Sequence, residues 1–176
     1  MTDIEIKAAA DSDFDAVYEF YRELIESMQG AKYRPEWKLG VYPTETQLRD
    51  AITKRTLYAA FAGGKIIGAF IMNDRCEPGY AAVSWQACAK QSEVRIIHLL
   101  AVSRPRQGAG VAKRMLAFAA GVCAAEGVKA IRLDVLERNL PAARLYASAG
   151  FTHVETISMY YEDTGDARFL MYEMVL

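Results

Sequence analysis

The segment His98-Leu-Leu-Ala-Val-Ser-Arg-Pro-Arg-Gln-Gly-Ala-Gly-Val-Ala-Lys-Arg-Met-Leu116 joins an apolar strand to a helix through a turn that contains two glycines and several cations. A helix start offers free backbone N–H groups and the positive end of the helix dipole, which together attract an anion. Glycine at 108 and 110 lets that anion lie against the backbone, and Arg106 can add charge-assisted bonds to phosphate oxygens. Although any strand-to-helix turn favours glycine, the cations indicate a site for a di- or triphosphate-like group.

Two common nucleotide-binding motifs are excluded by their missing parts. The turn has no Gly-Lys-Ser/Thr to hold magnesium and phosphate, and its glycine spacing lacks the third Gly of a dinucleotide fingerprint. Kinase, GTPase and dehydrogenase functions are therefore disfavoured.

The sequence on either side of this turn has the pattern of a strand, a helix and a second strand. Residues 93–102 form an apolar run typical of a buried strand, a helix is expected from the glycines to Glu126, and 129–136 reads as the next strand. This order predicts a right-handed crossover unit. A further helix is expected from Asn139 to Ala149, followed by strands at 151–160 and 168–175.

The first half of the chain predicts a strand, two helices and a hairpin, all within a single domain that covers residues 1–176. A strand is expected at 3–8, a helix capped by Ser12 or Asp13, an aromatic loop at 29–43, a second helix that Thr44 and Gln47 begin with a capping box, a hairpin of 57–62 and 65–73 around Gly63-Gly64, and a weaker strand at 83–86.

The composition excludes several classes of protein. With 52% hydrophobic residues, 24% charged residues and a net charge of −1, the chain offers no general attraction for nucleic acid. Cys76, Cys88 and Cys123 lack zinc spacing, and two histidines add little, so we expect no metal and reduced cysteines in a cytoplasmic protein. No basic start precedes an apolar run, and no stretch is long enough to span a membrane.

Two ordered motifs resemble the GCN5-related N-acetyltransferase (GNAT) family. Gln107-Gly-Ala-Gly-Val-Ala112 fits the family signature Gln/Arg-x-x-Gly-x-Gly/Ala, and Leu145-Tyr-Ala-Ser-Ala-Gly-Phe151 fits its later Leu-Tyr-x-x-x-Gly-Phe ending. The resemblance is firm over about 94–152. It implies an α/β (α+β) acyl-CoA N-acyltransferase fold, a mixed sheet of about seven strands flanked by about four helices.

The resemblance also implies that acetyl-CoA is the acyl-donor substrate. In the family, the pantetheine arm lies beside the central strand, and the pyrophosphate lies over the turn and the first helical residues. The cofactor-binding residues carried over onto this sequence are Leu100, Ala101, Val102, Arg106, Gln107, Gly108, Ala109, Gly110, Val111, Ala112, Lys113, Asn139, Ala143 and Tyr146.

Catalytic roles follow from the same resemblance. Tyr146 matches the tyrosine that protonates the departing sulfur, a task that suits a phenol, although tyrosines on amphipathic helices also serve as packing residues. Asn139, two helical turns earlier, can bond the pantetheine arm or cap its helix. His98 and Glu93 are the alternative general bases, because the family has no invariant one.

We expect the acceptor to be the primary amine of a small molecule, which attacks the thioester directly in a ternary complex. Acetylation of protein N-termini or lysines, transfer of a longer acyl chain and non-catalytic acetyl-CoA binding are the alternatives. Homodimers are common in the family, so the resemblance also implies a homodimer. Residues expected to shape the acceptor site, from the first loop and the last strands, are Tyr33, Trp37, Tyr42, Tyr160, Tyr161 and Glu162.

Overall fold

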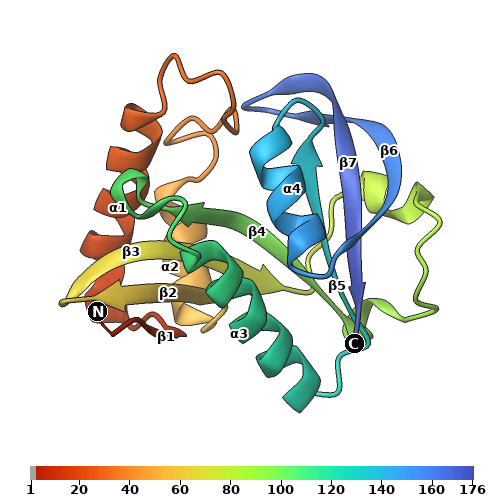
Figure 1. Cartoon of the computed structure of the whole chain (residues 1–176), viewed down its shortest axis with the longest axis horizontal. Coiled ribbons are helices and arrows are strands. Elements are labelled where there is room, and N and C mark those ends of the chain that lie inside the picture. Colours follow the sequence, from red (N-terminus) through yellow and green to blue (C-terminus); the bar gives the residue numbers. More distant parts are fainter. Residues whose placement is uncertain (1–2) are drawn as a thin grey trace. The chain divides into compact units, whose positions relative to one another are not determined.

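A computed structural model describes residues 3–176 of the chain. Within these residues, seven strands form one mixed sheet with the hydrogen-bonded order β1-β2-β3-β4-β5-β7-β6, accompanied by four α-helices (Figure 1). The strands are β1 (Glu5–Ala8), β2 (Leu57–Ala62), β3 (Lys65–Asn73), β4 (Val94–Val102), β5 (Ala130–Leu136), β6 (Thr152–Tyr161) and β7 (Gly165–Val175). The helices are α1 (Phe14–Ser27), α2 (Glu45–Thr53), α3 (Val111–Ala125) and α4 (Leu140–Ser148). The expected fold class is confirmed.

The described chain divides into two compact units. The first contains residues 3–31, 37–72 and 98–115, and the second contains residues 32–36, 73–97 and 116–176. Strand β4 and helix α3 each contribute residues to both units.

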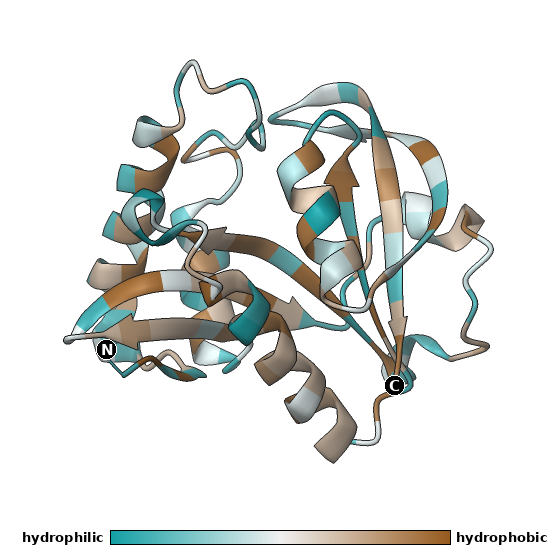
Figure 2. Ribbon diagram, viewed as in Figure 1, coloured by the Kyte–Doolittle hydropathy of each residue, from teal (hydrophilic) through white to brown (hydrophobic). Residues whose placement is uncertain are grey.

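The first unit is built on the antiparallel strands β1, β2 and β3. Gly63 and Gly64, with φ of 59° and 76°, form the expected two-residue hairpin turn. Helix α1 alternates apolar and polar bands (Figure 2), and its apolar side packs into the core of this unit. The capping box of α2 is confirmed, because Thr44 Oγ1 accepts from the Gln47 N–H at 3.0 Å and Gln47 Oε1 accepts from the Thr44 N–H at 2.8 Å.

The second unit is built on β5, which pairs in parallel with the start of β4 and antiparallel with β7, while β6 and β7 form a long hairpin. Side chains alternate between the two faces of a strand. Arg132, Asp134 and Leu136 therefore share one face of β5, and Leu133 lies on the other. Leu133 is paired with Tyr172, whose ring centroid is 5.8 Å from that of Tyr146 on α4. Helix α4 thus covers the face of β5 opposite Asp134.

The prediction of a strand at 83–86 is wrong. A short 3₁₀ helix, η2 (Pro78–Ala82), is followed there by a loop. The N–H groups of Gln86 and Ala87 both donate to the carboxylate of Glu173, at 2.7 and 3.1 Å. Because a buried side chain takes these donors, the segment has no need of a neighbouring strand.

Candidate functional site

Strand β4 has a kink at Leu99, directly after His98. Leu99 has a φ of +54°, which is unusual for a bulky residue in a strand. The Tyr21 hydroxyl, fully buried on α1, donates to the Leu99 carbonyl at 2.8 Å. Burial raises the pKa of Tyr21 well above its ordinary value, so this hydroxyl stays a donor. A residue with positive φ inside a strand interrupts the regular alternation of side chains at that point.

The turn after β4 is shaped by its own side chains. A 3₁₀ helix, η4 (Arg104–Arg106), starts it, and the amide of Gln107 donates through Nε2 to the Val102 carbonyl at 3.1 Å. The signature glutamine therefore ties the end of the strand to the start of the helix. Its own N–H donates to the Arg104 carbonyl at 3.2 Å.

The turn leaves a row of backbone donors without acceptors. The first bond of helix α3 runs from the Arg114 N–H to the Gly110 carbonyl at 3.1 Å. The N–H groups of Gly108, Gly110 and residues 111–113 have no acceptor within residues 3–176. Gly108 and Gly110 have φ of +78° and +77°, and no atom lies within 4 Å of the place where a Cβ would stand. The row is open to an approaching anion.

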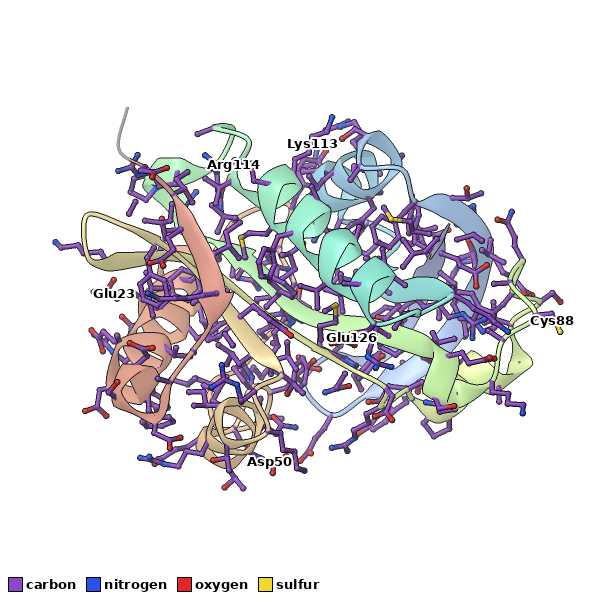
Figure 3. The ribbon with its side chains drawn as sticks, turned by 90° about the horizontal axis from the view of Figure 1, so that it is seen from below. Glu23, Asp50, Cys88, Lys113, Arg114 and Glu126 are labelled. Atoms are coloured by element: carbon purple, nitrogen blue, oxygen red, sulfur yellow. The ribbon has the colours of Figure 1, made fainter. Side chains whose placement is uncertain are left out.

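The four cations beside this row fall into two pairs. The guanidinium of Arg104 donates to the Ser27 carbonyl, and that of Arg114 donates to the Ile4 carbonyl at 3.4 Å. Within the described residues, Arg106 and Lys113 have no such partner, and Figure 3 shows Lys113 projecting from the start of α3. Arg106 and Lys113 are therefore the cations that remain available to a phosphate.

Helix α4 presents one line of candidate residues in the second unit. Asn139 is its N-cap, and its carbonyl accepts from the Ala143 N–H at 3.1 Å. The Asn139 side chain makes no capping bond, which leaves its amide available to a ligand. Tyr146, one turn after Ala143, follows on the same side of the helix.

The Tyr146 side chain is only 8% exposed, with its ring against Phe151 and Tyr172. Burial raises the pKa of the phenol, and the neighbouring Asp134 and Tyr172 raise it further, so the hydroxyl keeps its proton. No described residue bonds this hydroxyl, and no fully buried side-chain nitrogen or oxygen in residues 3–176 lacks a partner. The hydroxyl oxygen of Tyr146 is therefore not completely enclosed by the described residues.

Asp134 is a hydrogen-bonded carboxylate in the second unit that the sequence analysis did not single out. Its Oδ1 accepts from the hydroxyls of Tyr80 at 2.8 Å and Tyr161 at 3.0 Å. Burial raises the pKa of Asp134 to about 6, although the two tyrosine hydrogen bonds act in the opposite direction. The signal in the sequence was a single carboxylate inside the apolar run Leu133-Asp-Val-Leu136.

The two bases expected from the sequence have different surroundings. His98 is half-buried on β4, immediately before the kink. Glu93 accepts from Lys129 Nζ at 2.8 Å and from the Lys90 N–H at 2.8 Å, and these bonds lower the pKa of its carboxyl. A carboxylate held in this way is a weak proton acceptor.

The predicted residues are divided between the two units. The first unit holds His98, Leu100, Ala101, Val102, Arg106, Gln107, Gly108, Ala109, Gly110, Val111, Ala112 and Lys113, brought together at the end of β4 and the start of α3. The second unit holds Asn139, Ala143 and Tyr146 together on α4, and Glu93 apart from them beside Lys129. Residues 3–176 contain no group of three or more potential metal ligands and no helix long and apolar enough to cross a membrane.

One family model matches the chain, that of the acetyltransferase (GNAT) family, over residues 16–151. No curated protein is significantly similar to the chain in sequence. The family model includes both the turn after β4 and the whole of α4.

Solved acetyltransferases share the fold. A GNAT acetyltransferase from Streptococcus agalactiae has a TM-score of 0.77 at 17% identity, over 98% of this chain and 95% of that one. A GNAT acetyltransferase from Listeria monocytogenes has a TM-score of 0.76 at 19% identity, with the same coverage. The PaiA N-acetyltransferase from Thermoplasma acidophilum, solved with coenzyme A, has a TM-score of 0.74 at 17% identity, over 99% of both chains.

Proposed function

This chain belongs to the GNAT acetyltransferase family and is an acyltransferase, and from that premise we propose that it moves the acetyl group of acetyl-CoA to the primary amine of a small molecule. The amine attacks the thioester directly in a ternary complex. Residues 16–151 run through both compact units, which supports a single catalytic domain over residues 1–176.

The row of open N–H groups from Gly108 to Lys113 carries the proposal. Five backbone donors at a helix start, with Arg106 and Lys113 unpaired beside them, suit a pyrophosphate better than a single carboxylate. The remaining first-unit residues, Leu100–Val102, would hold the pantetheine arm through their main chain. Asn139 and Ala143 on α4 would contact the same arm.

Acetyl transfer requires the enzyme to hold two reactants together and to take a proton from an ammonium group. The enzyme must also stabilise the oxyanion and the departing thiolate. Tyr146 is suited to the last task. Its buried ring fixes its position, its raised pKa keeps the hydroxyl protonated, and the hydroxyl is not bonded to the protein within the described residues. It would donate to the sulfur as the carbon–sulfur bond breaks.

The test is the release of free coenzyme A from acetyl-CoA, followed with a thiol reagent across a panel of primary amines. We compare the native protein with Tyr146→Phe and with the double variant Arg106→Ala/Lys113→Ala. The matched control is Lys54→Ala/Lys65→Ala, which removes the same charge from exposed positions in the same unit. A general charge effect would appear in both double variants.

We expect amine-dependent release by the native protein. The Arg106/Lys113 variant should raise KM for acetyl-CoA about tenfold or more, at roughly 1 kcal/mol for each charge-assisted bond, while the control changes little. Tyr146→Phe should lower kcat by about 100-fold with little change in the KM for acetyl-CoA.

Turnover with peptides alone would show that the acceptor is a protein and not a small molecule. Binding of acetyl-CoA without turnover on any acceptor would favour a sensor, and no binding would overturn the proposal.

A further inference from the structure

In the second unit, the Asp134 carboxylate accepts hydrogen bonds from uncharged donors. Both tyrosine hydroxyls, from Tyr80 on η2 and Tyr161 on β6, donate to the same oxygen, Oδ1. Besides these two hydroxyls, the described residues offer the carboxylate one further hydrogen bond, from the backbone N–H of Asp134 itself. Neutral donors therefore hold this carboxylate in a fixed orientation, on a residue that is half-buried as a whole.

Arg132, the cation on the same face of β5 as Asp134, is already paired with another carboxylate. Arg132 donates through Nε to Glu173 at 2.9 Å, and its guanidinium lies 4.4 Å from the centre of the Trp85 ring. Glu173 is 1% exposed, so this pair forms a closed, neutral unit. The negative charge of Asp134 is left without a cationic partner on its own strand.

Aromatic rings surround the two tyrosines that orient Asp134. The ring of Tyr80 lies 5.5 Å from that of Trp85, and the ring of Tyr161 lies 5.0 Å from that of Phe169. An anionic carboxylate that has only neutral donors and lies among aromatic rings has the chemistry to bind an organic ammonium group.

We propose that Asp134 binds the ammonium group of the acceptor and takes its proton, with Tyr80 and Tyr161 as positioning residues. This rests on the proposed function. One N–H bond of the ammonium breaks and its proton passes to Oδ2, which leaves a neutral amine. The nitrogen lone pair forms the C–N bond as the C–S bond breaks. Tyr146 gives its proton to the departing sulfur and regains one when the nitrogen releases its second proton. Asp134 then releases its proton to solvent.

The position of Asp134 on β5 agrees with a mechanism in which two different residues carry out the two proton transfers. Asp134 and Tyr146 belong to opposite faces of the strand, so the proton acceptor for the amine and the proton donor for the sulfur are different groups on different sides. Besides the two tyrosine donors, the ionisable groups that influence Asp134 are Glu77, which raises its pKa, and Tyr146, whose own pKa responds to the carboxylate. A carboxylate with a pKa of about 6 is ionised in most molecules at neutral pH and can still accept a proton.

The experiment is the pH profile of kcat/KM with tyramine and with spermidine as probes, for the native protein and for Asp134→Asn, Tyr161→Phe and Tyr80→Phe. Acetyl-CoA binding is measured separately by calorimetry on each variant. Asp166→Asn, an exposed carboxylate of the β6–β7 hairpin, is the matched control. His98→Asn and Glu93→Gln test the two bases expected from the sequence.

We expect an acid limb near pH 6 in the native protein, where activity rises as Asp134 ionises. Asp134→Asn should lose that limb and at least 100-fold in kcat/KM while it still binds acetyl-CoA. Each Tyr→Phe variant removes a donor that lowers the pKa, so the limb should move to higher pH, a shift that a merely structural role would not produce. A limb unchanged in all three variants, or one lost in His98→Asn or Glu93→Gln instead, overturns the inference. Native protein that does not bind acetyl-CoA overturns the proposed function itself.

Discussion

At the scale of single residues, the burial of Asp134 should make the free energy of unfolding depend on pH. Its pKa rises from 3.8 to about 6 on folding, so the folded protein binds more protons than the unfolded chain between these values. Stability must then fall as pH rises through this window. The loss amounts to about 3 kcal/mol, at 1.36 kcal/mol per pKa unit.

Urea unfolding from pH 4 to pH 8 should show this decline in the native protein and a flatter profile in Asp134→Asn. Asparagine can still accept the two tyrosine hydrogen bonds but carries no charge to bury. Asp166→Asn, exposed on its hairpin, should follow the native profile. Parallel profiles for the native protein and Asp134→Asn would show that the carboxylate is not strained by burial.

Some candidate site residues can be recognised in the sequence and others cannot, for a physical reason. Gly108, Gly110 and Gln107 stand at fixed spacing within one short segment, so their pattern is visible without a structure. Asp134 and Tyr21 act through partners far away in the chain: Tyr161 is 27 residues from Asp134, and Leu99 is 78 residues from Tyr21. No local pattern encodes such pairings.

At the scale of elements, the start of α3 should tolerate a methyl group sterically but not functionally. Gly110 and Gly165 both have φ of +77° and open space at the Cβ position. Alanine at either position should cost about 1 kcal/mol of stability, because a Cβ is strained at positive φ. Gly110→Ala should in addition raise KM for acetyl-CoA about tenfold, because the methyl group covers the row of N–H donors.

Thermal unfolding and steady-state kinetics of the two variants separate strain from function. Gly165 lies at the β6–β7 turn, away from the phosphate turn in sequence, so its alanine variant supplies the strain alone. If Gly165→Ala raised KM as much as Gly110→Ala, the open donors could not be the cause.

Strand β3 approaches β4 so closely that only glycine fits at position 68. A Cβ on Gly68 would lie 2.7 Å from Met115 Sδ and 3.0 Å from the Ala101 carbonyl. Gly68→Ala should destabilise the protein by about 1–3 kcal/mol, whereas Gly121→Ala on α3, with open space around it, should stabilise it by up to about 1 kcal/mol. Denaturant unfolding midpoints check both signs. A stable Gly68→Ala would mean that β4 can move away from β3 at little cost.

Periodicity predicted the elements well where each element's own residues decide its structure. The apolar spacing of α1, the capping box of α2 and the Gly63-Gly64 hairpin are all local signals, and all are confirmed. The strand expected at 83–86 failed because Glu173, more than 80 residues later, captures two N–H groups of the segment. A buried carboxylate overrode the local pattern.

At the scale of the whole molecule, charge gives no guidance to function. The net charge is −1, so no long-range field steers an anionic donor to the protein. Affinity for acetyl-CoA should therefore arise locally, from the open N–H groups and from the side chains of Arg106 and Lys113 in the first unit. That unit should therefore respond most directly to the ligand.

Acetyl-CoA should raise the melting temperature of the protein. A ligand at 100 times its Kd adds about 2.7 kcal/mol to the free energy of unfolding, which for a chain of this size corresponds to roughly 5–11 °C. Arg106→Ala/Lys113→Ala should lose most of this shift at the same ligand concentration, because it weakens binding. Tyr146→Phe should keep it, because its hydroxyl acts on the departing sulfur and adds little to affinity. Calorimetric scans with and without ligand check this, and a single shifted transition would show that the two compact units unfold together. If Tyr146→Phe lost as much of the shift as the double variant, the phenol would be a binding group for the donor, and its proposed part in the chemical step would fail.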